Sequence, residues 1–164
     1  MGMIACFTSL APQALQQLHD NPDEIGDFLY PDGGEGEPPN YLDLDKAWHG
    51  LHYLLTGEAY GGPVPLSLAI LGGVEFGPEI SYGAARFLTV DEVAAVASAL
   101  SAVTPEVLRE RFNPEEMEEL EIYPQIWTED DPETLDYVLQ AFPDLQQFYA
   151  AAATRGEAAI LWIA

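Results

Sequence analysis

The sequence is short of basic residues, and this shortage argues against several classes of partner. Lys and Arg number 5 among 164 residues, against 28 Asp and Glu, which gives a formal charge of −23. A surface this negative repels the phosphate backbone of nucleic acid and the headgroups of anionic lipids. We therefore expect no nucleic-acid partner and no attachment to a membrane.

The sequence also has no long apolar run and only one cysteine. No stretch approaches the roughly 20 apolar residues that span a bilayer, and residues 1–7 lack the basic start of a signal peptide. Cys6 alone forms no disulfide within the chain, and the paired cysteine spacing of metal sites is absent. We expect a cytoplasmic protein without a bound metal. Because neither a G-x-G-x-x-G fingerprint nor a P-loop is present, we expect no cofactor.

The chain does have enough apolar sequence to form a core. Hydrophobic residues make up 48% of it, and at this length a single domain is the normal outcome. Strand-like patterns at 3–8, 80–82, 86–88 and 158–163 are separated by helix-like segments without a regular βαβ alternation. We therefore predict a single α+β domain over residues 1–164, in which several helices pack on a small mixed sheet with N- and C-terminal strands.

Helix starts are marked by capping residues. Thr89 and Glu92 have the spacing of a capping box, while Asn21, Thr104 and Asn113 each precede a proline that suits the first helical position. These patterns predict helices that begin directly after each of the four capping residues. For Asn21, the glutamate three positions later also predicts a capping box.

Two further segments stand out by their pattern. From 43 to 56 the apolar residues recur with a helical period and Gly57 follows, which predicts a helix that anchors the core. The segment 31–41 is rich in glycine, proline and acid, which predicts a mobile acidic loop. The apolar segment 64–71 suggests a third possibility, a homodimer that buries it.

Acidic residues are concentrated in two regions without a single base. Residues 1–45 contain 9 acids and residues 112–154 contain 11. Helix capping accounts for some of them, since anions stabilise first helical turns, but the lysines that usually lie four residues away are missing. We interpret the second region as a surface that docks a basic protein; high solubility is the alternative explanation. The candidate docking residues are Glu115, Glu116, Glu118, Glu119, Glu121, Glu129, Asp130, Asp131, Glu133 and Asp136.

Polar residues recur along the 43–56 segment. Asp45, His49, His52 and Thr56 have the spacing of one helical stripe, and two histidines three residues apart can share a metal ion. The H-E-x-x-H arrangement and a fourth ligand are absent, so we favour a hydrogen-bonded His52 at the core boundary over a metal ligand or a general base. For Arg86 we expect an ion pair with one of the many acids, with a ligand carboxylate as the alternative.

Four motifs resemble the YfbM-like family of small bacterial cytoplasmic proteins. They are Met1-Gly2-Met3-Ile4, the stretch from Leu42 to Gly57 with its Asp-Lys-x-Trp and Leu-His elements, Tyr82-Gly83-x-x-Arg86, and Glu121-Ile122-Tyr123-Pro124. The resemblance covers nearly the whole chain and implies an α+β domain of unknown function, with no catalytic residue to carry over. The positions that follow the family pattern form either one pocket or an internal polar network; they are Asp45, Lys46, Trp48, His52, Thr56, Arg86 and Tyr123.

Two hypotheses of function follow. The first is a non-enzymatic binding protein whose acidic surface neutralises a basic partner, in the manner of bacterial immunity proteins that block toxins. The second is a small-molecule-binding domain or enzyme with a polar pocket around Asp45, His52 and Arg86. They differ in geometry, because the second requires these three side chains to line one solvent-open cleft.

Overall fold

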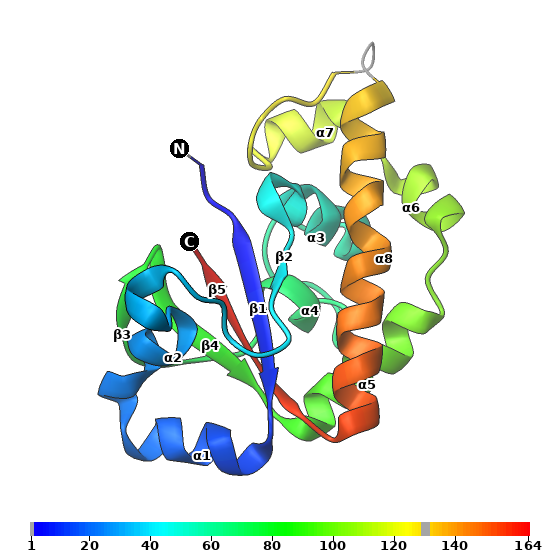
Figure 1. Cartoon of the computed structure of the whole chain (residues 1–164). Coiled ribbons are helices and arrows are strands. Elements are labelled where there is room, and N and C mark those ends of the chain that lie inside the picture. The colour runs from blue at the N-terminus through cyan, green and yellow to red at the C-terminus, as the bar shows by residue number, and fades with distance from the viewer. Residues whose placement is uncertain (1, 129–131) are drawn as a thin grey trace.

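The computed structural model describes residues 2–128 and 132–164, and a five-stranded sheet forms its centre (Figure 1). The strand order is β2-β1-β5-β4-β3. Every pairing between described strands is antiparallel, so the sheet is not the mixed sheet expected from the sequence. The strands are β1 (Ala5–Leu10), β2 (Leu42–Asp43), β3 (Val74–Ser81), β4 (Gly83–Leu88) and β5 (Ala158–Ile163).

Helices make up most of the remaining structure and give the predicted α+β class. The α-helices are α1 (Pro12–Asp20), α2 (Ile25–Leu29), α3 (Trp48–Thr56), α4 (Leu68–Leu71), α5 (Val90–Ser101), α6 (Pro105–Arg111), α7 (Pro114–Glu119) and α8 (Pro132–Arg155). Three short 3-10 turns are η1 (Pro22–Glu24), η2 (Asp32–Gly34) and η3 (Asp45–Ala47). None of the described helices is both long and apolar enough to cross a membrane.

Helices cover both faces of the sheet, which explains the apolar sequence of β5. Leu161 belongs to the larger core, formed with α3, α5 and α8, whereas Ile160 and Trp162 belong to a smaller core beneath α1 and α2. Because side chains alternate along a strand, only a strand buried on both faces is apolar throughout. The predicted C-terminal strand is therefore present, and it is the central strand of the sheet (Figure 1).

Three of the four predicted caps are present. Thr89 and Glu92 form the capping box, and the side chains of Thr104 and Asn113 accept backbone hydrogen bonds at the starts of α6 and α7. The capping prediction for Asn21 is wrong. Its side chain makes no cap hydrogen bond and its amide instead donates to the carbonyl of Gln17 (3.1 Å), so it closes α1 rather than opening the next turn.

The predicted 43–56 helix begins later than expected. Leu42 pairs with Phe7 of β1, and Asp45 has a φ of 50°, a left-handed conformation that interrupts a right-handed helix. The α-helical residues therefore begin at Trp48. The helix ends as predicted at Gly57, whose φ of 77° suits glycine.

Two other predicted segments are tied to the rest of the fold. In the 31–41 loop, the carbonyl of Pro39 accepts a hydrogen bond from Thr8, and the amide of Asn40 donates to the carbonyl of Ser9 (3.3 Å). The mobility of this loop stays a prediction. In the 64–71 segment, Ala69 and Ile70 are buried within the chain itself, whereas Val64 is exposed.

Candidate functional site

Within residues 2–128 and 132–164, the candidate docking residues lie on α7, directly after it and on the first turns of α8, at the top of Figure 1. Glu129, Asp130 and Asp131 fall outside the described residues. Glu133 and Asp136 lie on α8, and both are exposed. The other five lie on α7 or directly after it.

Three of the candidate acids stabilise the fold itself. Glu116 accepts a hydrogen bond from the hydroxyl of Tyr53 (2.6 Å), and Glu118 accepts one from the backbone N–H of Trp127 (2.7 Å). Burial, followed by the bond to Glu116, raises the pKa of Tyr53, so this hydroxyl keeps its proton. Asp136 forms an ion pair with Arg109 (3.1 Å). The surface available to a partner is therefore smaller than the sequence predicts.

Glu115, Glu119 and Glu121 are exposed and form no ion pair among the described residues. Leu120 and Ile126 lie beside them in the sequence and are 40% and 44% exposed. We call these five side chains the α7 surface. It combines negative charge with exposed apolar side chains, and this is the composition that protein interfaces show at their rim and centre.

The turn from Leu120 to Trp127 is held firmly against the core. The N–H of Ile122 donates to the carbonyl of Met117 (2.9 Å), and the indole of Trp127 donates back to the carbonyl of Ile122 (2.7 Å). Glu121 and Gln125 have φ values of 53° and 60°, which non-glycine residues seldom adopt. Conformations of this kind persist only where surrounding contacts enforce them.

His49 attaches this turn to α3. Its Nδ1 accepts the N–H of Tyr123 (2.8 Å), and its Nε2 therefore carries the proton and donates to the carbonyl of Ala59 (2.8 Å). Burial lowers the pKa of His49, which keeps the ring neutral, as these two bonds require. The sequence indicated a polar stripe at His49 but gave no sign of this long-range role.

Trp48 and Tyr123 form an adjoining network with the N-terminal segment. The indole of Trp48 donates to the carbonyl of Met3 (2.9 Å), while the N–H of Met3 donates to the hydroxyl of Tyr123 (2.9 Å). The two rings stack at a centroid distance of 5.6 Å. The ring of Tyr123 therefore packs on Trp48, while its hydroxyl binds the N-terminal segment.

His52 lies in the interior, and Arg86 is half-buried. His52 is 0% exposed, and neither of its ring nitrogens has a hydrogen-bond partner in the described part of the chain, so the expected hydrogen-bonded boundary residue is wrong. Burial above all, with the positive potential of His49 and of Arg86 added, lowers its pKa to about 4, despite an opposing effect of the Gly61 backbone. The ring is neutral at pH 7.

The ion pair expected for Arg86 is absent among the described residues. Its guanidinium donates instead to the carbonyl of Gly72 (2.9 Å) and, more weakly, to that of Ile70 (3.4 Å). Burial lowers its pKa from the usual value, although nearby Tyr149 and Glu75 oppose this. These two bonds fasten the C-terminal end of α4 to β4.

Asp45, Lys46 and Thr56 lie at the two ends of α3. The carboxylate of Asp45 accepts a hydrogen bond from the hydroxyl of Tyr137 (2.8 Å), which in turn accepts the N–H of Lys46 (3.2 Å). Burial and the bond to Asp45 raise the pKa of Tyr137 to about 12. Thr56 donates to the carbonyl of His52 (2.9 Å) in the last turn.

The predicted polar set therefore divides into separate groups. Asp45 is exposed and precedes α3, whereas His52 lies fully buried within α3, and Arg86 bonds to backbone. The bonds of Asp45, Lys46, Trp48, Tyr123 and Arg86 each join two segments of the chain, as in an internal polar network, whereas the bond from Thr56 to His52 lies within α3. No cluster of three or more His, Cys, Asp or Glu side chains suited to a metal ion occurs within residues 2–128 and 132–164.

Comparison with known proteins identifies the family. The sequence model of a domain of unknown function, DUF1877, matches residues 1–162. The chain belongs to the DUF1877 family. Protein YfbM of Escherichia coli K12 is 31% identical over 137 residues, which cover 77% of this chain and 75% of YfbM. The expected YfbM-like membership is confirmed.

The fold of this DUF1877 member is shared with a solved relative. The crystal structure of YfbM from Escherichia coli, a protein of unknown function, has a TM-score of 0.75 to this chain at 26% identity. The similarity covers 98% of this chain and 99% of the relative. The solved relative thus supports the fold, and both it and the family are described as of unknown function.

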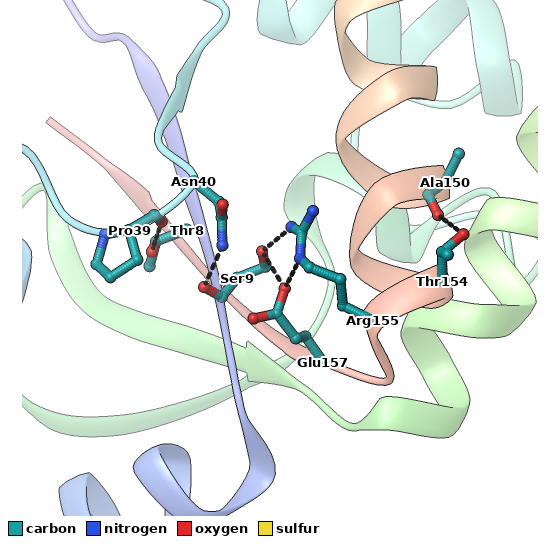
Figure 2. A network of polar contacts seen from close by, with 8 residues as sticks. All are labelled: Thr8, Ser9, Pro39, Asn40, Ala150, Thr154, Arg155 and Glu157. Carbon is teal, nitrogen blue, oxygen red and sulfur yellow. Dashed lines mark hydrogen bonds and ion pairs between the residues drawn. The ribbon is translucent and has the colours of Figure 1, made fainter.

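One polar network gave no signal in the sequence. Figure 2 shows Arg155 at the end of α8 beside Ser9 of β1 and Glu157, which precedes β5. The guanidinium donates to Glu157 (2.5 Å) and to the hydroxyl of Ser9 (3.2 Å), and that hydroxyl donates to Glu157 (3.1 Å). Arg155 is the only base after Arg111, and that isolation is the one feature that could have drawn attention to it.

Proposed function

We propose that this protein is a non-enzymatic cytoplasmic binding protein whose α7 surface docks a basic protein, in the manner of an immunity protein that blocks a toxin. The observation that carries the proposal is the exposure of Glu115, Glu119 and Glu121, without ion pairs among the described residues, next to exposed Leu120 and Ile126. A reducing cytoplasm suits its single, buried Cys6, whose pKa burial raises to about 11, which makes the thiol unreactive.

Charge and apolar area have different roles in such an interface. Unpaired glutamates attract a basic partner from a distance and accelerate association, and salt weakens this effect. The apolar side chains supply area that is removed from water on binding. Leu120 and Ile126 provide two such side chains among the glutamates, so the α7 surface has both parts.

The rigidity of the turn favours binding as well. A segment that is already fixed loses little conformational entropy when a partner docks on it. The bonds from Trp127 to Glu118 and from Tyr123 to His49 fix the 120–127 turn before any partner arrives. Solubility alone requires charge but gives no reason for a rigid turn with exposed apolar side chains.

The test is affinity capture from the native host with mass spectrometry, using two charge-matched variants. In the first, Glu115→Gln, Glu119→Gln and Glu121→Gln neutralise the α7 surface. In the control, Asp23→Asn, Glu24→Gln and Asp27→Asn remove the same charge from exposed sites on η1 and α2. We expect the wild type and the control to retain one basic protein at low salt, and the α7 variant to lose it.

Once a partner has been purified, its dissociation constant is measured for the wild type and for each variant. Affinity for the α7 variant is expected to fall at least tenfold, and Leu120→Ala with Ile126→Ala is expected to weaken binding at low and high salt alike. Equal loss in both charge variants would mean that total charge, not this surface, is responsible. Recovery of no basic protein at any salt concentration would contradict the proposal.

A further inference from the structure

A cavity of about 250 Å³ lies between the segment that leads into β2 and one face of α8. Asn40 and Leu42 line it on one side, and Asp144, Phe148, Ala151 and Arg155 line it on the other. The cavity shares no residue with the α7 surface. Its volume is somewhat below that of a site for a drug-sized molecule, so it suits a small ligand.

The four α8 residues form one continuous stripe. Positions 144, 148, 151 and 155 are spaced by four, three and four residues, which places them on the same helical face. Opposite charges stand at the two ends of the stripe, with Phe148 and Ala151 between them, and the polar Gln147 lines the cavity beside Phe148. The stripe therefore presents an anion, a largely apolar centre and a cation in order.

Arg155 is held in position with part of its guanidinium unused. Nε donates to Glu157 and Nη2 to Ser9, and Figure 2 shows Nη1 on the side of the group turned away from Glu157. Nη1 donates no hydrogen bond in the described part of the chain. Ser9 is fully buried and bonds to Glu157 as well, so the group is fixed by two residues before any ligand binds.

Asp144 provides the complementary charge. It is exposed, and within residues 2–128 and 132–164 it forms neither a hydrogen bond nor an ion pair. A simple anion is disfavoured in this cavity, because the protein carries a net charge of −23 and Arg155 is already paired with one carboxylate. A ligand without net charge avoids that repulsion.

We propose that this cavity binds a short peptide with free ends, its carboxylate on Nη1 of Arg155 and its ammonium group on Asp144. Eleven helical residues span about 16 Å, and two hydrogen bonds of about 3 Å each take up part of this. On this spacing of the two residues along the helix axis, about 10 Å remains, which is of the order of three extended residues. Phe148 and Ala151 then face the middle of the peptide, which favours small apolar side chains there.

The probe is trialanine, titrated by calorimetry and followed by backbone amide NMR shifts. Two modified peptides serve as partners, one N-acetylated and one with a C-terminal amide. We expect trialanine to bind and each modified peptide to bind about tenfold more weakly, because each lacks one charge-assisted bond. Shifts are expected at residues 40–42 and 144–155.

Matched variants assign the two ends. Asp144→Asn is expected to weaken trialanine about tenfold but to leave the N-acetylated peptide unchanged, while Glu110→Gln, an exposed acid on α6, changes neither. Arg155→Lys keeps a positive charge but loses the fixed fork, and is expected to weaken trialanine but not the C-terminal amide. The Asp144 variant removes no internal bond, so its fold is preserved.

Two results would overturn the proposal. One is the absence of heat and of amide shifts with trialanine at millimolar concentration. The other is equal binding of trialanine and both modified peptides, which would mean that the charged ends are not recognised. Neither result bears on the α7 surface, which shares no residue with this cavity.

Discussion

Single residues in the core differ in how well their polar atoms are satisfied, and His52 is the extreme case. Both of its ring nitrogens lack a partner among the described residues, whereas its neighbour His49 uses both. An unpartnered buried polar group costs free energy, typically about 1–3 kcal/mol. The apolar variant His52→Leu is therefore informative about stability and about pH.

The folding stability of the wild type is expected to fall between pH 6.5 and pH 4 because of His52. In the unfolded chain the imidazole binds a proton below about pH 6.5, whereas the folded state does so only near pH 4. The unfolded state therefore binds more protons in this range. The contribution of neutral His52 to the free energy of unfolding is fully present above pH 6.5. It decreases by up to about 3 kcal/mol as the pH falls towards 4.

Urea unfolding of wild type and His52→Leu across this range is the measurement. The contributions of all other groups cancel in the difference between the two unfolding free energies. We expect this difference to shift by about 3 kcal/mol in favour of His52→Leu as the pH falls. Parallel stability curves for the two proteins would show that the ring is not buried as a neutral group.

Elements are joined in this fold by close contacts that small residues permit. Gly50 lies on α3 where the 120–127 turn contacts it, and a Cβ there would lie 2.6 Å from Cη2 of the buried Trp127. Gly26 lies on α2, and a Cβ there would meet nothing within 4 Å. Both glycines are helical, but only Gly50 is required by packing.

Alanine substitutions at these two glycines are expected to have opposite effects. Gly50→Ala forces Trp127 to move and is expected to destabilise by about 1–3 kcal/mol, although alanine is the better helix former. Gly26→Ala is expected to stabilise by up to about 1 kcal/mol. Thermal unfolding of both variants gives the comparison, and a more stable Gly50→Ala protein would contradict the contact with Trp127.

Structural features that depend on residues close together in the sequence were predictable, and features that depend on contacts between distant residues were not. The capping box of Thr89 and Glu92 involves residues three apart, so the sequence suffices. The late start of α3 depends on the pairing of Leu42 with Phe7, thirty-five positions away, which no local pattern reveals. The same holds for Arg86, whose partners are carbonyls of another element.

For the candidate functional residues too, local patterns were visible in the sequence and long-range contacts were not. The concentration of acids near 115–121 is visible in composition, but the use of Glu116 and Glu118 inside the fold depends on Tyr53 and Trp127. Arg155 acquires its fixed position from Ser9, at the other end of the chain. Contacts between residues so far apart in the sequence depend on the order of the strands in the sheet, and no local residue pattern predicts them.

The whole molecule carries a charge that opposes its own compactness. The net charge of −23 already counts every Lys and Arg, so the two ion pairs among the described residues, formed by Arg109 and Arg155, do not reduce it. Mutual repulsion of like charges destabilises the compact state. The fold has to offset this through its two cores on either side of the sheet.

Added salt is therefore expected to stabilise the protein. Raising NaCl from about 10 mM to about 0.5 M shortens the Debye length from about 30 Å to a few Å and is expected to raise the thermal midpoint by about 5 °C. Glucose at equal osmolality is the uncharged control and should have a smaller effect. A midpoint unchanged or lowered by NaCl would show that repulsion does not limit stability.

The position of β5 has a consequence for synthesis on the ribosome. β5 separates the pair β1 and β2 from the hairpin of β3 and β4, and joins the two by antiparallel pairing on both of its edges. Translation produces 158–163 after the other four strands. Until then a nascent chain has two unconnected half-sheets, each with an open edge that attracts other chains, so assembly of the sheet has to await the arrival of its last strand.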